Sequence, residues 1–71
     1  MNQNEKVLRH LNDYGSITSL EALNGYGIMR LGARIYDLRS EGYPIVSEMT
    51  RSRNRFGEDV HFTTYRLQRP I

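Results

Sequence analysis

The hydrophobic pattern of the chain changes its period close to Pro44. Before this residue, apolar side chains recur at intervals of three and four, which is typical of amphipathic helices. After it, residues 45–50 and 60–67 alternate in polarity and are rich in β-branched and aromatic side chains, which predicts two strands. Gly42 is suited to ending a helix, and Pro44 holds the preceding residue extended, so the helical period cannot continue across this point. The sequence therefore predicts an α+β fold in which helices come first and strands last.

Two longer helices are expected before Pro44. The first covers residues 3–14, where the apolar side chains form one stripe. The other runs from Met29 to Glu41, because Leu31, Ile35 and Leu38 share one helical face. Both helices therefore have an apolar side to bury.

A shorter helix is expected between them. Thr18 and Glu21 have the spacing of a capping box, so this helix begins just after Thr18. Residues 24–27, Asn-Gly-Tyr-Gly, favour a turn, and we expect them to end the helix. Just upstream, Ser16–Thr18 is expected to be a short extended link whose Ile17 points into the core.

The length of the chain limits what it can hold. At 71 residues we expect one domain, 1–71, with an ordered core of about residues 3–67, and little room for a deep catalytic cleft. The absence of Cys excludes disulfides and thiolate zinc sites, and no apolar run approaches the ~18 residues of a membrane span. We expect a cytoplasmic protein without a cofactor. The core candidates are Val7, Leu8, Leu11, Tyr14, Ile17, Leu20, Leu23, Ile28, Leu31, Ile35, Leu38, Tyr43, Ile45, Tyr65 and Leu67.

The basic residues are concentrated in two segments. Ten Lys or Arg face eight Asp or Glu, a net charge of only +2, and nine of the ten are Arg. Arginine favours planar, bidentate contacts with phosphates and guanine edges. Six of the ten basic residues lie in the third expected helix or between the two expected strands: Arg30, Arg34, Arg39, Arg51, Arg53 and Arg55. The small net charge therefore conceals two locally basic segments.

Four motifs follow one another along the chain: Gly15–Ala22, Tyr26–Ile28, Arg30–Arg39 and Gly42–Tyr43. In this order they resemble the small winged helix-turn-helix domains common in bacteriophages and prophages, from about residue 3 to residue 67. The resemblance implies a winged helix-turn-helix fold of three helices followed by a two-stranded β-hairpin wing. It also implies DNA binding, with the third helix in the major groove and the wing on the DNA backbone, but it does not identify a biological role. The leading hypothesis is a non-enzymatic DNA-binding protein of phage or prophage type that acts in transcription regulation or excision.

Helical geometry indicates which side chains of the third helix face outward. At about 100° per residue, Ala33 and Tyr36 lie opposite the core direction, and Arg30 and Arg39 flank that face. Small side chains there allow a close approach to a groove, and the arginines reach guanine edges or phosphates. The expected DNA-binding residues are Arg30, Ala33, Arg34, Tyr36, Arg39, Arg51, Arg53, Asn54 and Arg55.

Two of these segments have alternative interpretations. Arg34 is as well placed to pair with Asp37, three residues on, as to contact a phosphate. The arginines at 51, 53 and 55 share one face if their segment is strand-like, whereas Phe56 is expected to pack against the hairpin strands rather than to enter the minor groove.

Other functions are weighed against DNA binding. The main alternative is a protein–protein interaction module, such as a phage inhibitor of a host protein, because acids such as Asp37 and Asp59 lie near the basic residues. RNA binding is weaker, since the aromatics are too isolated for a stacking platform. His10 and His61 lack metal-ligand spacing, and no nucleophile has a base beside it, so no catalytic or metal site is expected. One small domain contacts few bases, so a homodimer or tandem sites are expected on double-stranded DNA.

Overall fold

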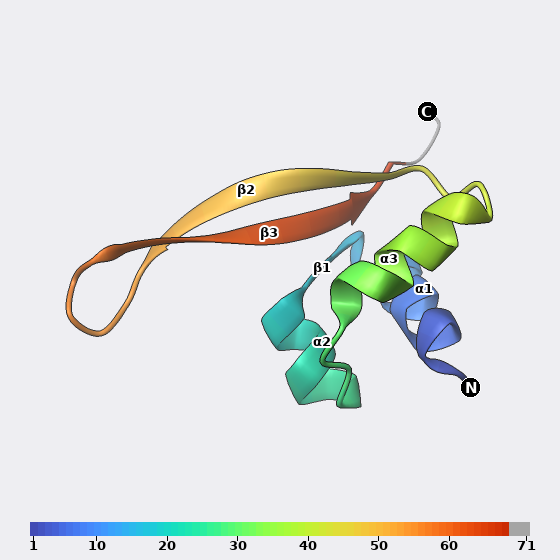
Figure 1. Cartoon of the computed structure of the whole chain (residues 1–71), viewed down its shortest axis with the longest axis horizontal. Helices are drawn as coiled ribbons and strands as arrows, with labels where there is room; N and C mark the ends of the chain where they lie inside the picture. The colour runs from blue at the N-terminus through green and yellow to red at the C-terminus, as the bar shows by residue number, and fades with distance from the viewer. Residues whose placement is uncertain (69–71) are drawn as a thin grey trace.

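The helices gather at one end of the molecule, and a long β-hairpin extends away from them (Figure 1). The computed structural model describes residues 1–68, so residues 69–71 of the predicted domain lie outside the described range. The elements are α1 (Gln3–Tyr14), β1 (Ser16–Thr18), α2 (Ser19–Tyr26), α3 (Leu31–Ser40), β2 (Ile45–Arg53) and β3 (Asp59–Leu67). The predicted α+β class, with three helices followed by a hairpin, is confirmed.

Local caps fix the limits of the first two helices. The predicted capping box is present, because the Glu21 backbone N–H donates to Thr18 Oγ1 at 3.2 Å and the Thr18 N–H donates to Glu21 Oε1 at 2.9 Å. The end predicted for α2 was wrong: the helix continues through Gly25 and ends at Gly27, whose φ is 70°. One left-handed glycine whose N–H bonds back to Leu23 is enough to end the helix, and the turn-forming residues before it remain helical.

The third helix is shorter than predicted. It covers Leu31–Ser40 rather than Met29–Glu41. Arg30 is its N-cap, with φ −112° and ψ 61°, and no side chain caps the helix. Glu41 is the C-cap, and Gly42, with φ 99°, turns the chain toward β2.

The sheet has three antiparallel strands in the order β1-β3-β2, so the prediction of two strands was incomplete. Ser16–Thr18, expected as a link, pairs with β3 and places Ile17 opposite Tyr65. Both hairpin strands are also longer than predicted, at nine residues each, which leaves a turn of residues 54–58. Arg51 and Arg53 therefore belong to β2 rather than to a loop.

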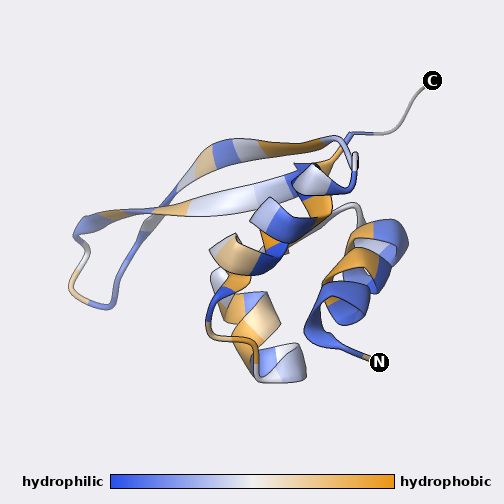
Figure 2. Ribbon diagram, turned by 45° about the vertical axis from the view of Figure 1, so that its right-hand side comes forward, coloured by the Kyte–Doolittle hydropathy of each residue, from blue (hydrophilic) through white to orange (hydrophobic). Residues whose placement is uncertain are grey.

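The core lies where the helices meet the base of the hairpin, and hydrophobic segments of all three helices gather there (Figure 2). Leu8, Tyr65 and Leu67 pack partly buried against it, and the buried His10, absent from the predicted core, lies with Nδ1 2.6 Å from the Tyr26 hydroxyl oxygen. The buried hydrophobic residues are Val7, Leu11, Ile17, Ala22, Ile28, Leu31, Ile35, Leu38 and Ile45.

Four core predictions were wrong, because the side chains of Tyr14, Leu20, Leu23 and Tyr43 are exposed. Tyr14, Leu20 and Tyr43 lie at or near the end of an element, whereas Leu23 lies inside α2 on a side that the neighbouring elements leave partly uncovered. Residues 49–63, here called the outer hairpin, contribute no side chain to the buried core. The outer hairpin is therefore an arm whose side chains are available for contacts outside the domain.

Candidate nucleic-acid interface

One face of the hairpin is turned toward α3. Side chains alternate between faces along a strand, so Ile45, Ser47, Met49, Arg51 and Arg53 share one face of β2. Ile45 is in the core, and Ser47 accepts a hydrogen bond from α3, which identifies this side as the α3 face of the hairpin. The α3 face thus carries two of the three arginines predicted for the wing.

The exposed surface of α3 contains the aromatic candidate. The side chain of Tyr36 is 71% exposed, and Arg30, just before the helix, is exposed as well. Within residues 1–68, the Arg30 side chain makes no ion pair or hydrogen bond. Ala33 is half-buried, so fewer side chains of α3 face outward than helical geometry predicted. Tyr36 and Arg30 are free to contact a ligand, as is the neighbouring Met29, which is 81% exposed.

Arg34 is engaged within the domain. Its Nη2 lies 3.3 Å from Asp37 Oδ2, and its Nη1 donates to Gln3 Oε1 at 3.1 Å. Of the two alternatives left open by the sequence, the ion pair with Asp37 is the one formed in the structure. Arg34 therefore joins α3 to the start of α1.

Arg39 is also engaged, and its partners lie in the hairpin. Its Nε donates to the Ile45 carbonyl oxygen at 2.9 Å, and its Nη2 donates to Ser47 Oγ at 2.8 Å. The guanidinium carbon lies 6.0 Å from the centre of the Tyr65 ring. Arg39 therefore connects α3 to both strands of the hairpin.

A single carboxylate faces two arginines of the outer hairpin. Arg51 Nη2 lies 3.6 Å from Asp59 Oδ2, and Arg53 Nε lies 3.6 Å from Asp59 Oδ1. All three side chains are more than half exposed, so these ion pairs are weak and solvated. Both arginines can turn outward toward a stronger anion at little cost.

The turn does not continue the strand alternation. Arg55 lies within it, so the single face predicted for three arginines holds only Arg51 and Arg53. Asn54 Oδ1 accepts the backbone N–H groups of Phe56 at 2.9 Å and Glu58 at 3.1 Å, which gives Asn54 a role in shaping the turn. The Phe56 side chain is 78% exposed, so the expectation that it packs on the strands was wrong.

The charge of the hairpin is close to balanced. Residues 45–67 carry four Arg and three acids, a net charge of +1. On the face opposite α3, Arg66 forms a two-bond pair with Glu48, at 3.1 and 3.3 Å. The excess positive charge therefore lies toward the tip, where the Arg55 side chain has no ion pair or hydrogen bond with any described residue.

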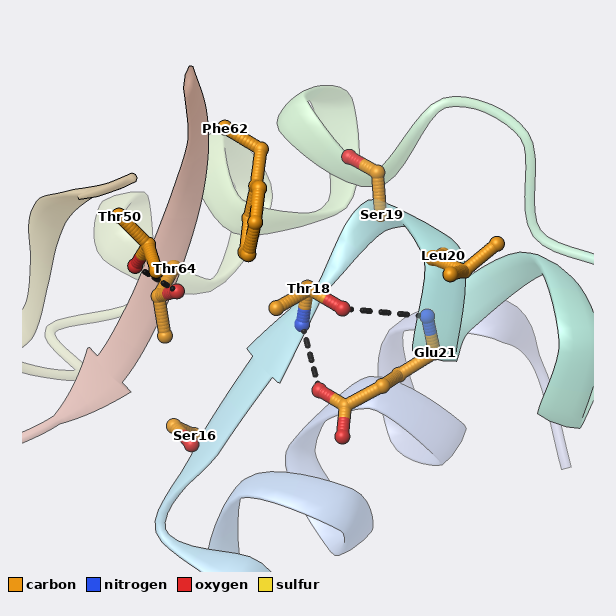
Figure 3. Close-up of a pocket in the computed structure, with 8 residues that line it drawn as sticks. All are labelled: Ser16, Thr18, Ser19, Leu20, Glu21, Thr50, Phe62 and Thr64. Atoms are coloured by element: carbon orange, nitrogen blue, oxygen red, sulfur yellow. Dashed lines mark hydrogen bonds between the residues drawn. The ribbon is translucent and has the colours of Figure 1, made fainter. Parts of the chain in front are cut away.

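A shallow hollow lies between α2 and the hairpin face that points away from α3 (Figure 3). Its one carboxylate belongs to Glu21 and is held in the capping box, and the hydroxyls of Thr50 and Thr64 lie 2.7 Å apart and bond to each other. Ser16, Thr18, Ser19, Leu20, Glu21, Thr50, Phe62 and Thr64 line the hollow. The hollow lacks a base beside a nucleophile and offers mainly an apolar surface.

Neither a metal cluster nor a membrane-spanning helix is found in the part of the chain that the structure describes. No three His, Asp or Glu side chains of residues 1–68 are grouped to hold an ion. In the same range, no helix is long and apolar enough to cross a bilayer.

The three helices, the hairpin and the exposed α3 surface define a recognised class of domain. Residues 2–70 match the family model of the winged helix-turn-helix domain, and the chain belongs to this family. Domains of this class are in general non-enzymatic, DNA-binding modules. Neither a curated protein nor a solved structure gives a significant match to the chain.

The positions of the basic segments could be predicted from the sequence, but the residues that pair with their arginines could not. Sequence reasoning did not identify Asp59 as the partner of Arg51 and Arg53, or Ile45 and Ser47 as the partners of Arg39. One signal was present, since Glu58 and Asp59 directly follow the basic segment. A hairpin with a five-residue turn brings Asp59 opposite Arg53, but the turn length is not evident from the sequence pattern.

Proposed function

We propose that the protein is a sequence-specific DNA-binding protein of phage or prophage type that acts in transcription regulation or excision. Tyr36 and Arg30 on the exposed side of α3 would read bases in the major groove, and the outer hairpin would contact the DNA backbone. The observation that carries the proposal is the pairing of this uncovered α3 surface with a basic arm on the same side of the sheet. Membership of the winged helix-turn-helix family supports DNA as the class of ligand.

Phosphate contacts would supply most of the affinity. Arg30 and Arg55 have no partner among residues 1–68, and Arg51 and Arg53 have only an exposed ion-pair partner. Arg34 and Arg39 would contribute less, because their guanidinium groups are occupied within the domain. Four available arginines predict a slope of about −3.6 for log K against log salt, from ~0.9 for each neutralised phosphate.

The test is to select bound duplexes from a random pool and to titrate the selected DNA at several salt concentrations. A slope between about −3 and −4 is expected. Arg53→Ala should weaken binding to all sequences alike, whereas Tyr36→Ala should change the preferred sequence. Arg9→Ala is the matched control, since Arg9 also has only an exposed carboxylate partner at 3.6 Å, Asp13 on α1. Undetectable or salt-insensitive binding would overturn the proposal.

The near balance of charge on the hairpin favours one second candidate, a protein-interaction module that binds a host protein. Three acids among residues 45–67 would weaken a polyanion contact but suit a protein surface of mixed charge. Capture of a defined partner from nuclease-treated host lysate, together with no duplex binding, would favour this candidate. If duplexes are selected, a palindromic motif would indicate a homodimer on DNA.

A further inference from the structure

We infer that Phe56 is a wedge that enters the minor groove, separates two base pairs and bends the DNA. This inference rests on the proposed DNA binding and adds an activity to it, the deformation of the bound duplex. It assigns the outer hairpin a role beyond backbone contact.

The Phe56 ring is at the far end of the hairpin. Its side chain is 78% exposed, and it makes no ring contact with any described residue. Phe62, the other phenylalanine, lines the hollow near α2, at the base of the arm. An aromatic ring at the end of an arm, outside the core, buries little surface within the domain and is available to stack on another surface.

Hydrogen bonds within the turn hold the backbone of Phe56 in one conformation. Asn54 Oδ1 accepts the Phe56 N–H at 2.9 Å, while the Asn54 N–H donates to the Glu58 carbonyl oxygen at 3.0 Å. The Asn54 side-chain amide also donates to Glu58 Oε1 at 3.1 Å, and Gly57 has a φ of 76°. These bonds fix the backbone at Phe56 before any ligand binds. A prearranged wedge loses little conformational entropy on insertion.

Two arginines near the ring are placed to contact phosphates beside a groove of duplex DNA, while two acids, Glu58 and Asp59, lie at the other side of the turn. Arg55, the preceding residue, has no partner among residues 1–68, and Arg53 is close behind it in β2. Both can contact the phosphates that border the groove while the ring enters between bases.

The length of the arm is suitable for this contact. From Met49 to the start of the turn at Asn54, five steps of ~3.3 Å per residue span about 17 Å. Half a helical turn of B-DNA, the separation between a major groove and the adjacent minor groove, is also about 17 Å. With α3 in the major groove, the turn can therefore reach the neighbouring minor groove. Phenylalanine is among the side chains that proteins insert between base steps there.

The experiment uses the full chain and a selected duplex that carries 2-aminopurine at each candidate step in turn, with end-to-end energy transfer to report bending. Wild-type protein should increase 2-aminopurine fluorescence at one step and bend the duplex by roughly 20–90°. Phe56→Ala should abolish both signals and reduce affinity about tenfold, because one stacked aromatic is lost. Phe56→Leu, which keeps an apolar wedge, should retain most of the bend.

Leu20→Ala is the matched control, because Leu20 is an apolar residue of α2 that is 66% exposed and lies outside both α3 and the outer hairpin. It should leave bend and fluorescence unchanged. The inference is overturned if the wild-type complex shows no bend, or if Phe56→Ala bends DNA as the wild type does; binding by α3 would still support the proposed function. If the wild type binds no duplex at all, both proposals fail. Unfolding curves of Phe56→Ala should match the wild type, which separates wedge loss from misfolding.

Discussion

Asp59 limits the positive charge that the outer hairpin offers. Its carboxylate lies 3.6 Å from both Arg51 and Arg53, so one acid partly neutralises two bases. In the proposed complex this carboxylate would also lie near phosphates. At about 8 Å in water, each repulsion amounts to ~0.5 kcal/mol, or about twofold in affinity. Asp59 therefore acts against binding in proportion to the number of phosphates close to it.

Asp59→Asn should bind duplex DNA about three- to tenfold more tightly at low salt, with a steeper salt dependence, as measured by fluorescence anisotropy. Its free energy of unfolding should change by less than about 0.5 kcal/mol, since exposed pairs contribute little. Asp13→Asn is the control, because Asp13 pairs with Arg9 at the same distance on α1. Equal affinities for Asp59→Asn and Asp13→Asn would contradict the role given to Asp59.

At the scale of elements, Arg39 joins α3 to the hairpin and so holds the hairpin in position against the helix. It bonds to the Ile45 carbonyl and the Ser47 hydroxyl of β2 and lies over Tyr65 of β3. Hydrogen bonds from a charged donor are stronger than neutral ones, but this side chain is partly exposed, so its loss should cost about 1–2 kcal/mol. The angle of the hairpin to α3 depends on this residue.

Arg39→Ala should lower the free energy of unfolding by about 1–2 kcal/mol in urea titrations and speed amide exchange in residues 45–49. It should also weaken the effect of Arg51→Ala and Arg53→Ala on DNA affinity, because a loosely held arm no longer contacts the backbone in a fixed position. Arg9→Ala should cost less than about 0.5 kcal/mol. Equal stabilities for the two variants would show that Arg39 does not join the elements.

The elements that the sequence predicted correctly are those with local signals. The capping box at Thr18 and Glu21 is one example, and the change of period near Pro44 is another. β1 was missed as a strand because three residues are too few to show alternation, and its pairing depends on Tyr65, almost fifty positions away. Local chemistry specifies the caps and turns, whereas contacts across the fold specify the sheet.

In the candidate site, too, features set by local sequence were predicted correctly and features set by distant contacts were not. The positions of Tyr36 and the arginines could be predicted from helical period and clustering. Which arginines are occupied could not, since the partners of Arg39 and Arg53 depend on strand register. Phe56 was correctly placed between the strands, but the packing expected of its ring was wrong, because apolar character alone does not show which way a side chain in a turn points.

At the scale of the whole molecule, stability depends on the helices and the base of the sheet. Ile17 is 0% exposed and lies on β1, the strand that joins the sheet to the helical core. Val60, a residue of similar size on the outer hairpin, is 36% exposed and outside the core. These two positions allow the contribution of the core and of the arm to be compared directly.

Ile17→Ala should lower the free energy of unfolding by about 2–4 kcal/mol, because it leaves a cavity in the core. For a domain of this size that is a large part of the total stability. Val60→Ala should cost less than about 1 kcal/mol. Urea unfolding followed by circular dichroism measures both, and similar losses would show that the outer hairpin is part of the cooperative core.

The separation of the outer hairpin from the core has a consequence for how proteins of this kind diverge. Because no side chain of residues 49–63 belongs to the buried core, most substitutions there, outside turn residues such as Asn54 and Gly57, should cost little stability. A lineage can therefore alter the arm, and with it the preferred partner, while the helices stay under the strict selection that a small core imposes. The arm is the part of this molecule in which new specificity can arise by single steps, each of which leaves a folded protein.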